Sequence, residues 1–264
     1  MIIAVDIGNT NIKLGLFEGD RLIEGDRLRY SWRISTDVTR TSDEHGSIIK
    51  QLIRSEQIEL SQINGGIISS VIPQLNYTIT HMLQYYFGFT PLIVGPGVKT
   101  GLNIKYENPR ELGTDRIVNC VAASKKYGAP FILIDFGTAT TFNVVNRKNE
   151  FLGGCITVGI KTGIKGLASS TACLPEVELC RPASVLANNT IKAIQSGVIY
   201  GMTGQVEYIV EKLKKELGDP DCKVVATGGL SQLLDFDGKK FFDVVDRGLS
   251  LEGLNIVYNL NQKQ

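Results

Sequence analysis

Two aspartates with matching neighbours carry the most specific chemical pattern in this chain. Asp6 lies in the segment IIAVDIGNTNIKLGLF and Asp135 in FILIDFGTATTFNVV, and a glycine follows each of them two positions later. Hydroxyl and amide residues come next, namely Thr10, Asn11, Thr138, Thr140 and Thr141. Such side chains bind phosphate oxygens together with backbone N–H groups, and an aspartate can hold a metal ion. The segments therefore predict two phosphate-binding turns; the alternative is a pair of tight turns without a ligand.

Each segment also predicts the β-hairpin that holds its turn. A short apolar run precedes each aspartate, and a second apolar stretch follows the polar turn. Gly8 and Gly137 allow the backbone to approach a ligand closely. Asp6 and Asp135 lie 129 positions apart in a chain of 264 residues. The spacing therefore predicts two similar halves, each with its own phosphate-binding turn.

A third glycine-rich segment, Ala226–Leu230, follows the short apolar strand predicted at residues 223–225. Residues 231–234 are predicted to begin a helix after it. A strand, two glycines and a helix in this order present flat backbone to a planar ligand such as adenine. Two adjacent glycines are also an ordinary turn, but their position after both aspartate segments favours a nucleotide site.

The composition is that of a folded protein with no overall charge bias. Hydrophobic residues make up 43% of the chain and charged residues 21%, and the formal net charge is +1. This balance gives no basic footprint for nucleic acid. No apolar run reaches the roughly 18 to 20 residues that cross a bilayer. Asp6 interrupts the N-terminal apolar stretch too early for a signal peptide. We therefore expect a cytoplasmic protein without a nucleic-acid or membrane partner.

Cysteine and histidine offer few candidates for catalysis or metal binding. The five cysteines include no C-x-x-C pair, so the sequence indicates neither a disulfide framework nor a zinc site. The two histidines, His45 and His81, lie in a polar and an apolar-periodic stretch, where structural roles are expected. Acid–base chemistry is therefore expected to depend on carboxylates.

Taken together, the motifs resemble the superfamily of acetate and sugar kinases, Hsp70 and actin, and more specifically the type III pantothenate kinases. The segments that carry the closer resemblance are DIGNTNIK at 6–13, NPRELGTDR at 108–116, DFGTATT at 135–141, NTIKAIQSG at 189–197 and ATGGL at 226–230. The resemblance implies an α/β fold of duplicated ribonuclease H-like (actin-like ATPase) domains, each a mixed five-stranded sheet flanked by helices. It also implies a division into residues 1–116, with the first phosphate loop, and 117–264, with the second phosphate loop and the adenosine loop.

The resemblance further implies ATP-dependent phosphorylation of pantothenate to 4′-phosphopantothenate, the first step of coenzyme A synthesis. It assigns Mg²⁺, bound with the nucleotide, to Asp6, and a monovalent cation, K⁺ or NH₄⁺, to Asp135. The ATP-binding residues it implies are Asp6, Ile7, Gly8, Asn9, Thr10, Asn11, Ile12, Lys13 and Thr138.

The acceptor site implied by the resemblance centres on Asp115, the expected catalytic base. The apolar residues Ile117, Val118, Val121 and Ala122 predict a helix that begins at Thr114 or Asp115, so the residue pattern alone favours a helix cap. The resemblance instead makes Asp115 accept the hydroxyl proton, while Arg116 can bind a carboxylate with two hydrogen bonds. The substrate-binding residues it implies are Tyr106, Gly113, Thr114, Asp115, Arg116 and Thr190. Tyr106 either packs on the pantoyl methyl groups or fills a half-buried strand position.

The longest predicted helix covers Thr190–Leu217, with Gly218 at its C-terminal end. Gly197, Gly201 and Gly204 interrupt it, and each glycine costs about 1 kcal/mol relative to alanine. Close packing against another element would account for them. That element lies either within the same chain or, as the resemblance implies, in a second subunit of a homodimer whose active site is shared through Thr190.

Two positions depart from the usual family pattern. Thr114 stands where alanine is more common, and Val158-Gly159-Ile160 stands where Pro-Gly-Ile is usual, which changes the stiffness of the segment after the second turn. Two alternatives to pantothenate phosphorylation remain. One is a sugar kinase or another small-molecule kinase of the same superfamily, and the other is a transcriptional accessory factor related to the family.

Overall fold

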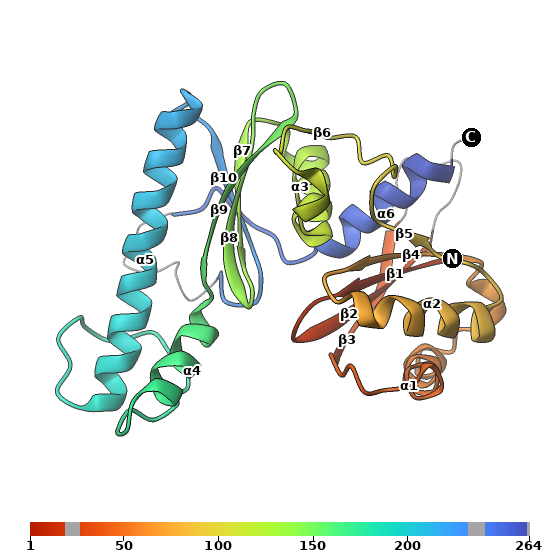
Figure 1. Cartoon of the computed structure of the whole chain (residues 1–264), viewed down its shortest axis with the longest axis horizontal. Coiled ribbons are helices and arrows are strands. Elements are labelled where there is room, and N and C mark those ends of the chain that lie inside the picture. Colours follow the sequence, from red (N-terminus) through yellow and green to blue (C-terminus); the bar gives the residue numbers. More distant parts are fainter. Residues whose placement is uncertain (19–26, 232–240, 263–264) are drawn as a thin grey trace. The chain divides into compact units, whose positions relative to one another are not determined.

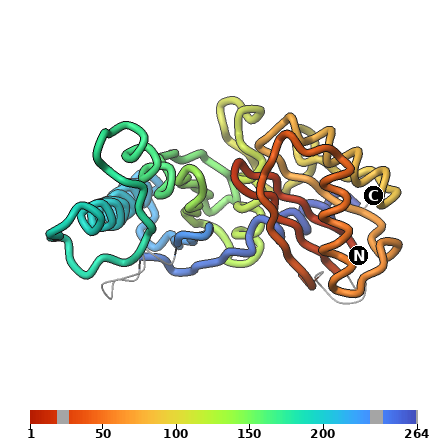
Figure 2. The backbone as a smooth tube through the Cα atoms, turned by 90° about the horizontal axis from the view of Figure 1, so that it is seen from below, coloured from red at the N-terminus to blue at the C-terminus, as the bar shows by residue number. Residues whose placement is uncertain are grey.

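The computed structural model describes residues 1–18, 27–231 and 241–262, and the chain forms two compact units (Figures 1 and 2). The first unit contains Met1–Leu102, Glu107–Ala122 and Gly248–Gln264, and the second contains Asn103–Tyr106 and Ala123–Arg247. These units differ from a division after residue 116, because the next six residues and the C-terminal helix belong with the first unit.

The first unit is built on a mixed five-stranded sheet in the order β3-β2-β1-β4-β5. Its strands are β1 (Ile2–Ile7), β2 (Asn11–Glu18), β3 (Arg27–Ser35), β4 (Gly65–Ser70) and β5 (Leu92–Ile93). The first three pair antiparallel, and β4 and β5 run parallel to β1. The predicted hairpin at the first aspartate is therefore confirmed as β1 and β2.

Helices cover both faces of this sheet (Figure 1). Ile3, Val5 and Ile7 pack with the buried residues of α1 (Ser42–Ser55) and α2 (Pro73–Phe87). The other face packs against α6 (Leu249–Gln262), whose chain returns beside the N-terminal strands. Because successive strand residues point to opposite faces, Asp6 lies on the α6 side. Short 3-10 turns occur at Leu60–Gln62 and Pro109–Glu111.

The second unit contains a six-stranded sheet in the order β11-β10-β7-β8-β9-β6. Its strands are β6 (Asn103–Ile104), β7 (Phe131–Phe136), β8 (Ala139–Val145), β9 (Glu150–Val158), β10 (Lys223–Thr227) and β11 (Val244–Val245). The order β9-β8-β7-β10-β11 and its strand directions match the first sheet. The expectation of five strands in each sheet needs correction here, since β6 adds a parallel edge strand beside β9.

Three further helices connect these strands. α3 (Thr114–Tyr127) begins in the first unit, whereas α4 (Ile160–Ser170) and α5 (Thr190–Leu217) lie in the second. The predicted bounds of α5 are confirmed: the Asn189 side chain accepts a hydrogen bond from the backbone N–H of Lys192, and Gly218 ends the helix at φ 69°. Among the described helices, none combines the length and apolar character that a membrane span requires.

Candidate active site

The carboxylate of Asp6 lies between two neighbouring strands near the end of β1. Lys13 on β2 is its antiparallel partner, and Ser69 on β4 is its parallel partner. Asp6 is only 6% exposed. Lys13 Nζ lies 3.3 Å from Asp6 Oδ2 and donates a second hydrogen bond of 3.0 Å to Ser250 Oγ. The ammonium group of Lys13 is therefore held in place by two partners, Asp6 and Ser250.

Ser250 is a site residue that the sequence patterns did not identify. It is buried at the start of α6 and lies 237 positions from Lys13 along the chain. A lone serine in an apolar segment carries no local motif. Its contact with Lys13 depends on the return of the C-terminal helix to the first sheet, which spacing within a short segment does not reveal.

The first of the two turns predicted to bind phosphate is a compact connection between β1 and β2. The backbone N–H of Gly8 donates to the carbonyl oxygen of Asn11 at 3.0 Å. The side chains of Asn9 and Thr10 are exposed. Among the residues expected to bind ATP, Ile7 and Ile12 have fully buried side chains in the core between the sheet and helices α1 and α2. Only their backbone groups are therefore available to a ligand.

A cavity of about 710 Å³ lies beside this turn. Three segments line it: Asn9 in the turn, residues 35–38 with Arg40 after β3, and residues 71–74 at the start of α2. The loop that follows β3 and the segment that joins β4 to α2 thus border the same open space as the turn. A small ligand on this side of the first unit would contact polar groups from Asn9, Thr36 and Arg40.

Asp115 lies in the first turn of α3, which begins close to the C-terminal end of β4. The hydroxyl of Thr114 donates to the carbonyl oxygen of Ser70 at 3.2 Å and lies 3.0 Å from Ser69 Oγ. The threonine that departs from the usual family pattern thus fixes the start of α3 to the strand beside Asp6. Gly113 leaves space for the carboxylate, because an added Cβ there would collide with Asp115 Oδ1.

The environment of Asp115 disfavours its ionised form. Burial raises the pKa of the Asp115 carboxyl, and the charge of Asp6 raises it further, while the Arg116 backbone N–H, the Arg116 guanidinium and Lys13 lower it. Asp115 Oδ1 accepts the hydrogen bond from Arg116 N at 2.8 Å. Within the described part of the chain, no hydrogen bond is formed by Oδ2. One oxygen therefore stabilises the helix start and the other can accept a proton.

Arg116 is buried on α3 and is only 7% exposed. One turn later Cys120 is fully buried, and burial raises the pKa of its thiol far above the ordinary value. This part of α3 is an interior surface rather than a reactive thiol site.

The second turn predicted to bind phosphate, between β7 and β8, repeats the strand environment of the first. Asp135 pairs antiparallel with Thr141 and parallel with Thr227, in the positions that Lys13 and Ser69 occupy around Asp6. Thr141 supplies a hydroxyl where the first turn has an ammonium group. The second turn is also one residue shorter between its strands.

Gly228 brings backbone and carboxylate oxygens together beside Asp135. Its φ is +91°, and an added Cβ would lie 2.6 Å from the Phe136 carbonyl oxygen and 2.8 Å from Asp135 Oδ1. Only glycine fits this conformation and this space. Carboxylate and carbonyl oxygens are the donors that hard cations prefer. The helix expected after this segment lies outside the described residues from position 232 onward.

The start of α4 packs closely on the second turn. Thr162 Oγ1 donates to the carbonyl oxygen of Thr138 at 2.7 Å, and an added Cβ at Gly159 would clash with the Gly137 and Thr138 carbonyls. Val158, at the position where the family usually has proline, is the last residue of β9 and pairs with Ala139.

The remaining candidate residues lie in the second unit or away from the turns. The Tyr106 ring is half-buried and packs against Phe151 with a centroid distance of 6.1 Å, but Tyr106 lies two residues beyond the end of β6 rather than in a strand. Thr190 is exposed at the first position of α5. His45 is buried in α1, where burial lowers the pKa of its imidazole, whereas His81 is exposed on α2.

The described residues contain no group of three or more His, Cys, Asp or Glu side chains that could hold a metal ion. A cation at either aspartate would therefore need other oxygen ligands, such as backbone carbonyls, water or the phosphates of a nucleotide. The single carboxylates of Asp6 and Asp135 fit that mode of binding.

Comparison with known proteins gives a consistent picture of family and fold. A family model described as type III pantothenate kinase matches residues 2–212. A Campylobacter jejuni protein assigned to the Baf family of transcriptional activators is 19% identical, with a TM-score of 0.59 over 99% of this chain and 100% of its own. A Sinorhizobium meliloti protein assigned as a 2-dehydro-3-deoxygalactonokinase is 10% identical, with a TM-score of 0.61 over 100% and 98%. The inorganic polyphosphate/ATP-glucomannokinase of Arthrobacter sp. strain KM is 13% identical, with a TM-score of 0.51 over 98% of each chain.

Proposed function

The chain belongs to the type III pantothenate kinase family, and we propose that it transfers the γ-phosphoryl group of ATP to the primary hydroxyl of pantothenate. The product is 4′-phosphopantothenate, an intermediate of coenzyme A synthesis. The observation that carries this proposal is the placement of Asp115. Its half-buried carboxyl lies under the influence of Asp6, at the start of a helix that Thr114 fixes to β4.

Phosphoryl transfer needs positioning, neutralisation of phosphate charge and a group that accepts the hydroxyl proton. Asp115 Oδ2 takes the proton from the pantothenate hydroxyl as that oxygen attacks the γ-phosphorus, and ADP leaves. A carboxyl with a raised pKa is a more effective base than an ordinary exposed one. Lys13, held by Ser250, offers a cation to the nucleotide phosphates.

The nucleotide binds through the two turns in this proposal. Residues 6–13 and Thr138 would contact ATP. Asp6 would hold the Mg²⁺ ion that accompanies the nucleotide. When bound, Mg²⁺ neutralises negative charge on the transferring phosphates. Asp135 binds a monovalent cation, K⁺ or NH₄⁺, and the carbonyl oxygen of Phe136 supports this assignment as an oxygen donor beside it.

We also propose that the acceptor site is completed by Tyr106, Gly113, Thr114, Arg116 and, from the partner subunit of a homodimer, Thr190. Support for a dimer comes from the second unit. Among the described residues, none outside α5 comes within 4 Å of a Cβ added at the α5 glycines at 197, 201 and 204. Large apolar side chains of the second unit are also exposed, namely Ile156, Val158, Leu167, Ile191 and Tyr208. A second copy of the chain would bury this kind of surface.

Two other functions are consistent with the fold. The sugar kinases among the structural neighbours suggest a sugar acceptor, and the neighbour assigned to the Baf family suggests a transcriptional accessory role in the cytoplasm. The placement of Asp115 beside Asp6 favours catalysis over a purely regulatory role, and the net charge of +1 does not support binding to DNA.

The test is an assay of ADP release with ATP, Mg²⁺ and K⁺ against a panel of acceptors. The panel contains pantothenate, glucose, mannose and 2-dehydro-3-deoxygalactonate. We expect turnover with pantothenate and with no other acceptor in the panel. Turnover with a sugar would establish the first alternative, and no turnover with any acceptor by folded protein would favour the second.

A further inference from the structure

We propose that Thr36 is a positioning residue that orients the peptide groups of the Gly8–Asn11 turn for phosphate. This inference rests on the proposed function, because it assigns the first turn to the nucleotide. Thr36 is the first residue after β3 and makes two hydrogen bonds to the turn. Its hydroxyl donates to the carbonyl oxygen of Gly8 at 2.6 Å, and its backbone N–H donates to the carbonyl oxygen of Thr10 at 3.0 Å.

These two bonds determine where the neighbouring N–H groups point. In a planar trans peptide, the C=O of one residue and the N–H of the next point in opposite directions. With the Gly8 and Thr10 carbonyls directed at Thr36, the N–H groups of Asn9 and Asn11 are directed away from it. The Gly8 N–H is already bonded to Asn11 O. Thr36 thus directs two N–H groups of the turn away from itself, where an anion could accept from them.

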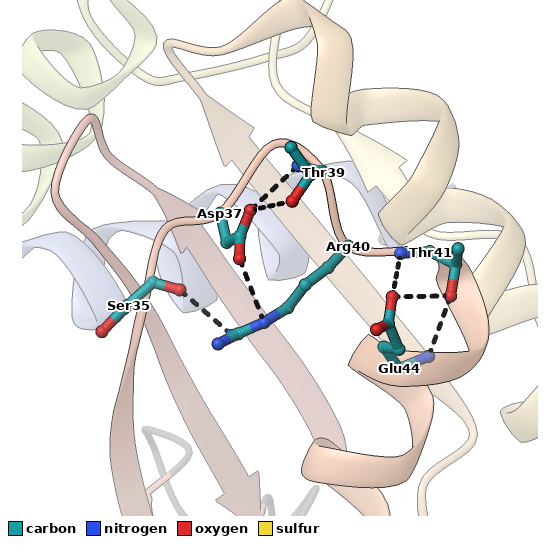
Figure 3. Close-up of polar contacts among 6 residues, drawn as sticks. All are labelled: Ser35, Asp37, Thr39, Arg40, Thr41 and Glu44. Atoms are coloured by element: carbon teal, nitrogen blue, oxygen red, sulfur yellow. Dashed lines mark hydrogen bonds and ion pairs between the residues drawn. The ribbon is translucent and has the colours of Figure 1, made fainter.

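The segment that carries Thr36 is itself firmly held (Figure 3). The Arg40 guanidinium reaches back to the Ser35 carbonyl oxygen at 3.4 Å and to Asp37 Oδ2 at 3.6 Å. Asp37 Oδ1 accepts from the N–H and hydroxyl of Thr39, at 3.0 and 2.6 Å. These bonds close residues 35–40 into a small ring, so Thr36 is presented from a fixed support.

Immediately after this ring, α1 begins with a reciprocal cap. The Thr41 hydroxyl accepts from the backbone N–H of Glu44, and the Glu44 carboxylate accepts from the backbone N–H of Thr41 at 2.7 Å. The chain is therefore anchored on both sides of Thr36, by β3 before it and by α1 after it.

The second unit contains an independent arrangement of the same kind. The hydroxyl of Thr162 donates to the carbonyl oxygen of Thr138, within the second turn, at 2.7 Å. Thr162 comes from a helix, α4, rather than from a strand end. A threonine hydroxyl fixed to a turn carbonyl is thus a property of both turns, and ordinary pairing between adjacent strands does not account for the second case.

The test compares three variants, of which two remove a hydroxyl and one keeps it. Thr36→Val removes the Gly8 bond but keeps the backbone N–H and the branched shape, and Thr36→Ser keeps the hydroxyl. Ser42→Ala is the matched control, because Ser42 Oγ also donates to a carbonyl in the first unit, that of Thr78, at 3.0 Å, but not in the turn. The readouts are the Kd for Mg-ADP by calorimetry, the thermal midpoint, and the amide NMR shifts of Asn9 and Asn11.

We expect Thr36→Val to weaken Mg-ADP binding by about tenfold, because the N–H groups are no longer preorganised. Thr36→Ser and Ser42→Ala should bind within about twofold of wild type. In wild type, Mg-ADP should shift the amide signals of both Asn9 and Asn11. Unchanged affinity of Thr36→Val, or unmoved Asn9 and Asn11 signals in wild type that binds Mg-ADP, would overturn the role of Thr36. Wild type that binds no nucleotide would instead contradict the proposed function.

Discussion

At the residue scale, the two oxygens of Asp115 would allow it to fill both roles that the sequence pattern presents as alternatives. Oδ1 accepts the Arg116 N–H and supports the first turn of α3, which is the cap-like role. Burial and the charge of Asp6 raise the pKa of the carboxyl, which suits a proton acceptor. A helix cap and a catalytic base are compatible because each uses a different oxygen.

Replacing Asp115 by asparagine should abolish most turnover and leave the fold intact. Loss of a general base costs on the order of 10²- to 10⁴-fold in rate. The measurement is kcat with saturating ATP and pantothenate, with circular dichroism to check folding. A loss of less than tenfold in folded protein would remove Asp115 from the role of base.

The thermal midpoint of Asp115→Asn should differ from that of wild type by an amount that depends on pH. The folded-state pKa of Asp115 is raised, so the group adds stability below its unfolded pKa, and this contribution is lost as pH rises through the folded pKa. At neutral pH the ionised carboxylate therefore opposes folding, and Asp115→Asn should have a higher thermal midpoint than wild type. The difference should shrink as pH falls toward 4. A lower midpoint for the variant at neutral pH would contradict this.

Asp135 gives a second prediction at the residue scale. The rate should depend on a monovalent cation, because the aspartate and the Phe136 carbonyl supply oxygen ligands beside Gly228. Replacing K⁺ with Na⁺ or tetramethylammonium at constant ionic strength should lower kcat, while NH₄⁺ should preserve it. An undiminished rate in tetramethylammonium would show that Asp135 has a different role.

At the element scale, helix α6 packs on the face of the first sheet that carries Asp6. Gly253 of α6 lies so close to α3 that an added Cβ would clash with the carbonyl of Val118. The same helix places Ser250 beside Lys13. Close packing of α6 on α3 and the strands therefore maintains the positions of Lys13 and Asp115 together.

Substituting Gly253 by alanine should cost about 1 to 3 kcal/mol in the free energy of unfolding, because the backbone of α3 must move. Gly166→Ala in α4 is the matched control, since no described residue outside α4 comes within 4 Å of a Cβ added there. That control should be neutral or stabilising by up to about 1 kcal/mol. Chemical denaturation of both variants measures the difference, and equal stabilities would argue against tight contact between α6 and α3.

The elements differ in how well the sequence predicts them, and the reason is how local their signals are. Both hairpins and the ends of α5 were predicted, because turn residues, apolar runs and the terminal Asn189 and Gly218 lie within a few positions of one another. Strand β6 has only two residues and carries no periodic pattern. Ser250 and Thr36 gain their partners only when distant segments meet, so no local pattern indicates them.

At the scale of the whole molecule, we propose that two subunits of a dimer share each active site. Thr190 is exposed at the start of α5, and no other described part of the chain covers the glycine-bearing face of that helix. A symmetric partner would bury the same face of each subunit.

Mixing two inactive variants, Asp115→Asn and Thr190→Trp, tests for the shared site under conditions of subunit exchange. In a mixed dimer, one of the two sites contains intact Asp115 and intact Thr190 from different subunits. At equal mixing, up to about a quarter of wild-type activity should return. Thr190→Ser keeps the hydroxyl and adds no bulk, so this control variant should remain active by itself. Exchange demonstrated by mass spectrometry without recovery, or a fully active monomer, would contradict a shared site.

We propose that this chain phosphorylates the primary hydroxyl of pantothenate and that Asp115 is the base. The most direct measurement is ³¹P NMR of a reaction containing ATP, pantothenate, Mg²⁺ and K⁺, run with wild type and with Asp115→Asn. Wild type should produce a phosphomonoester signal split into a triplet by the adjacent methylene protons, and the variant should produce almost none. ATP consumption by wild type without that signal, or equal product formation by the variant, would contradict the claim.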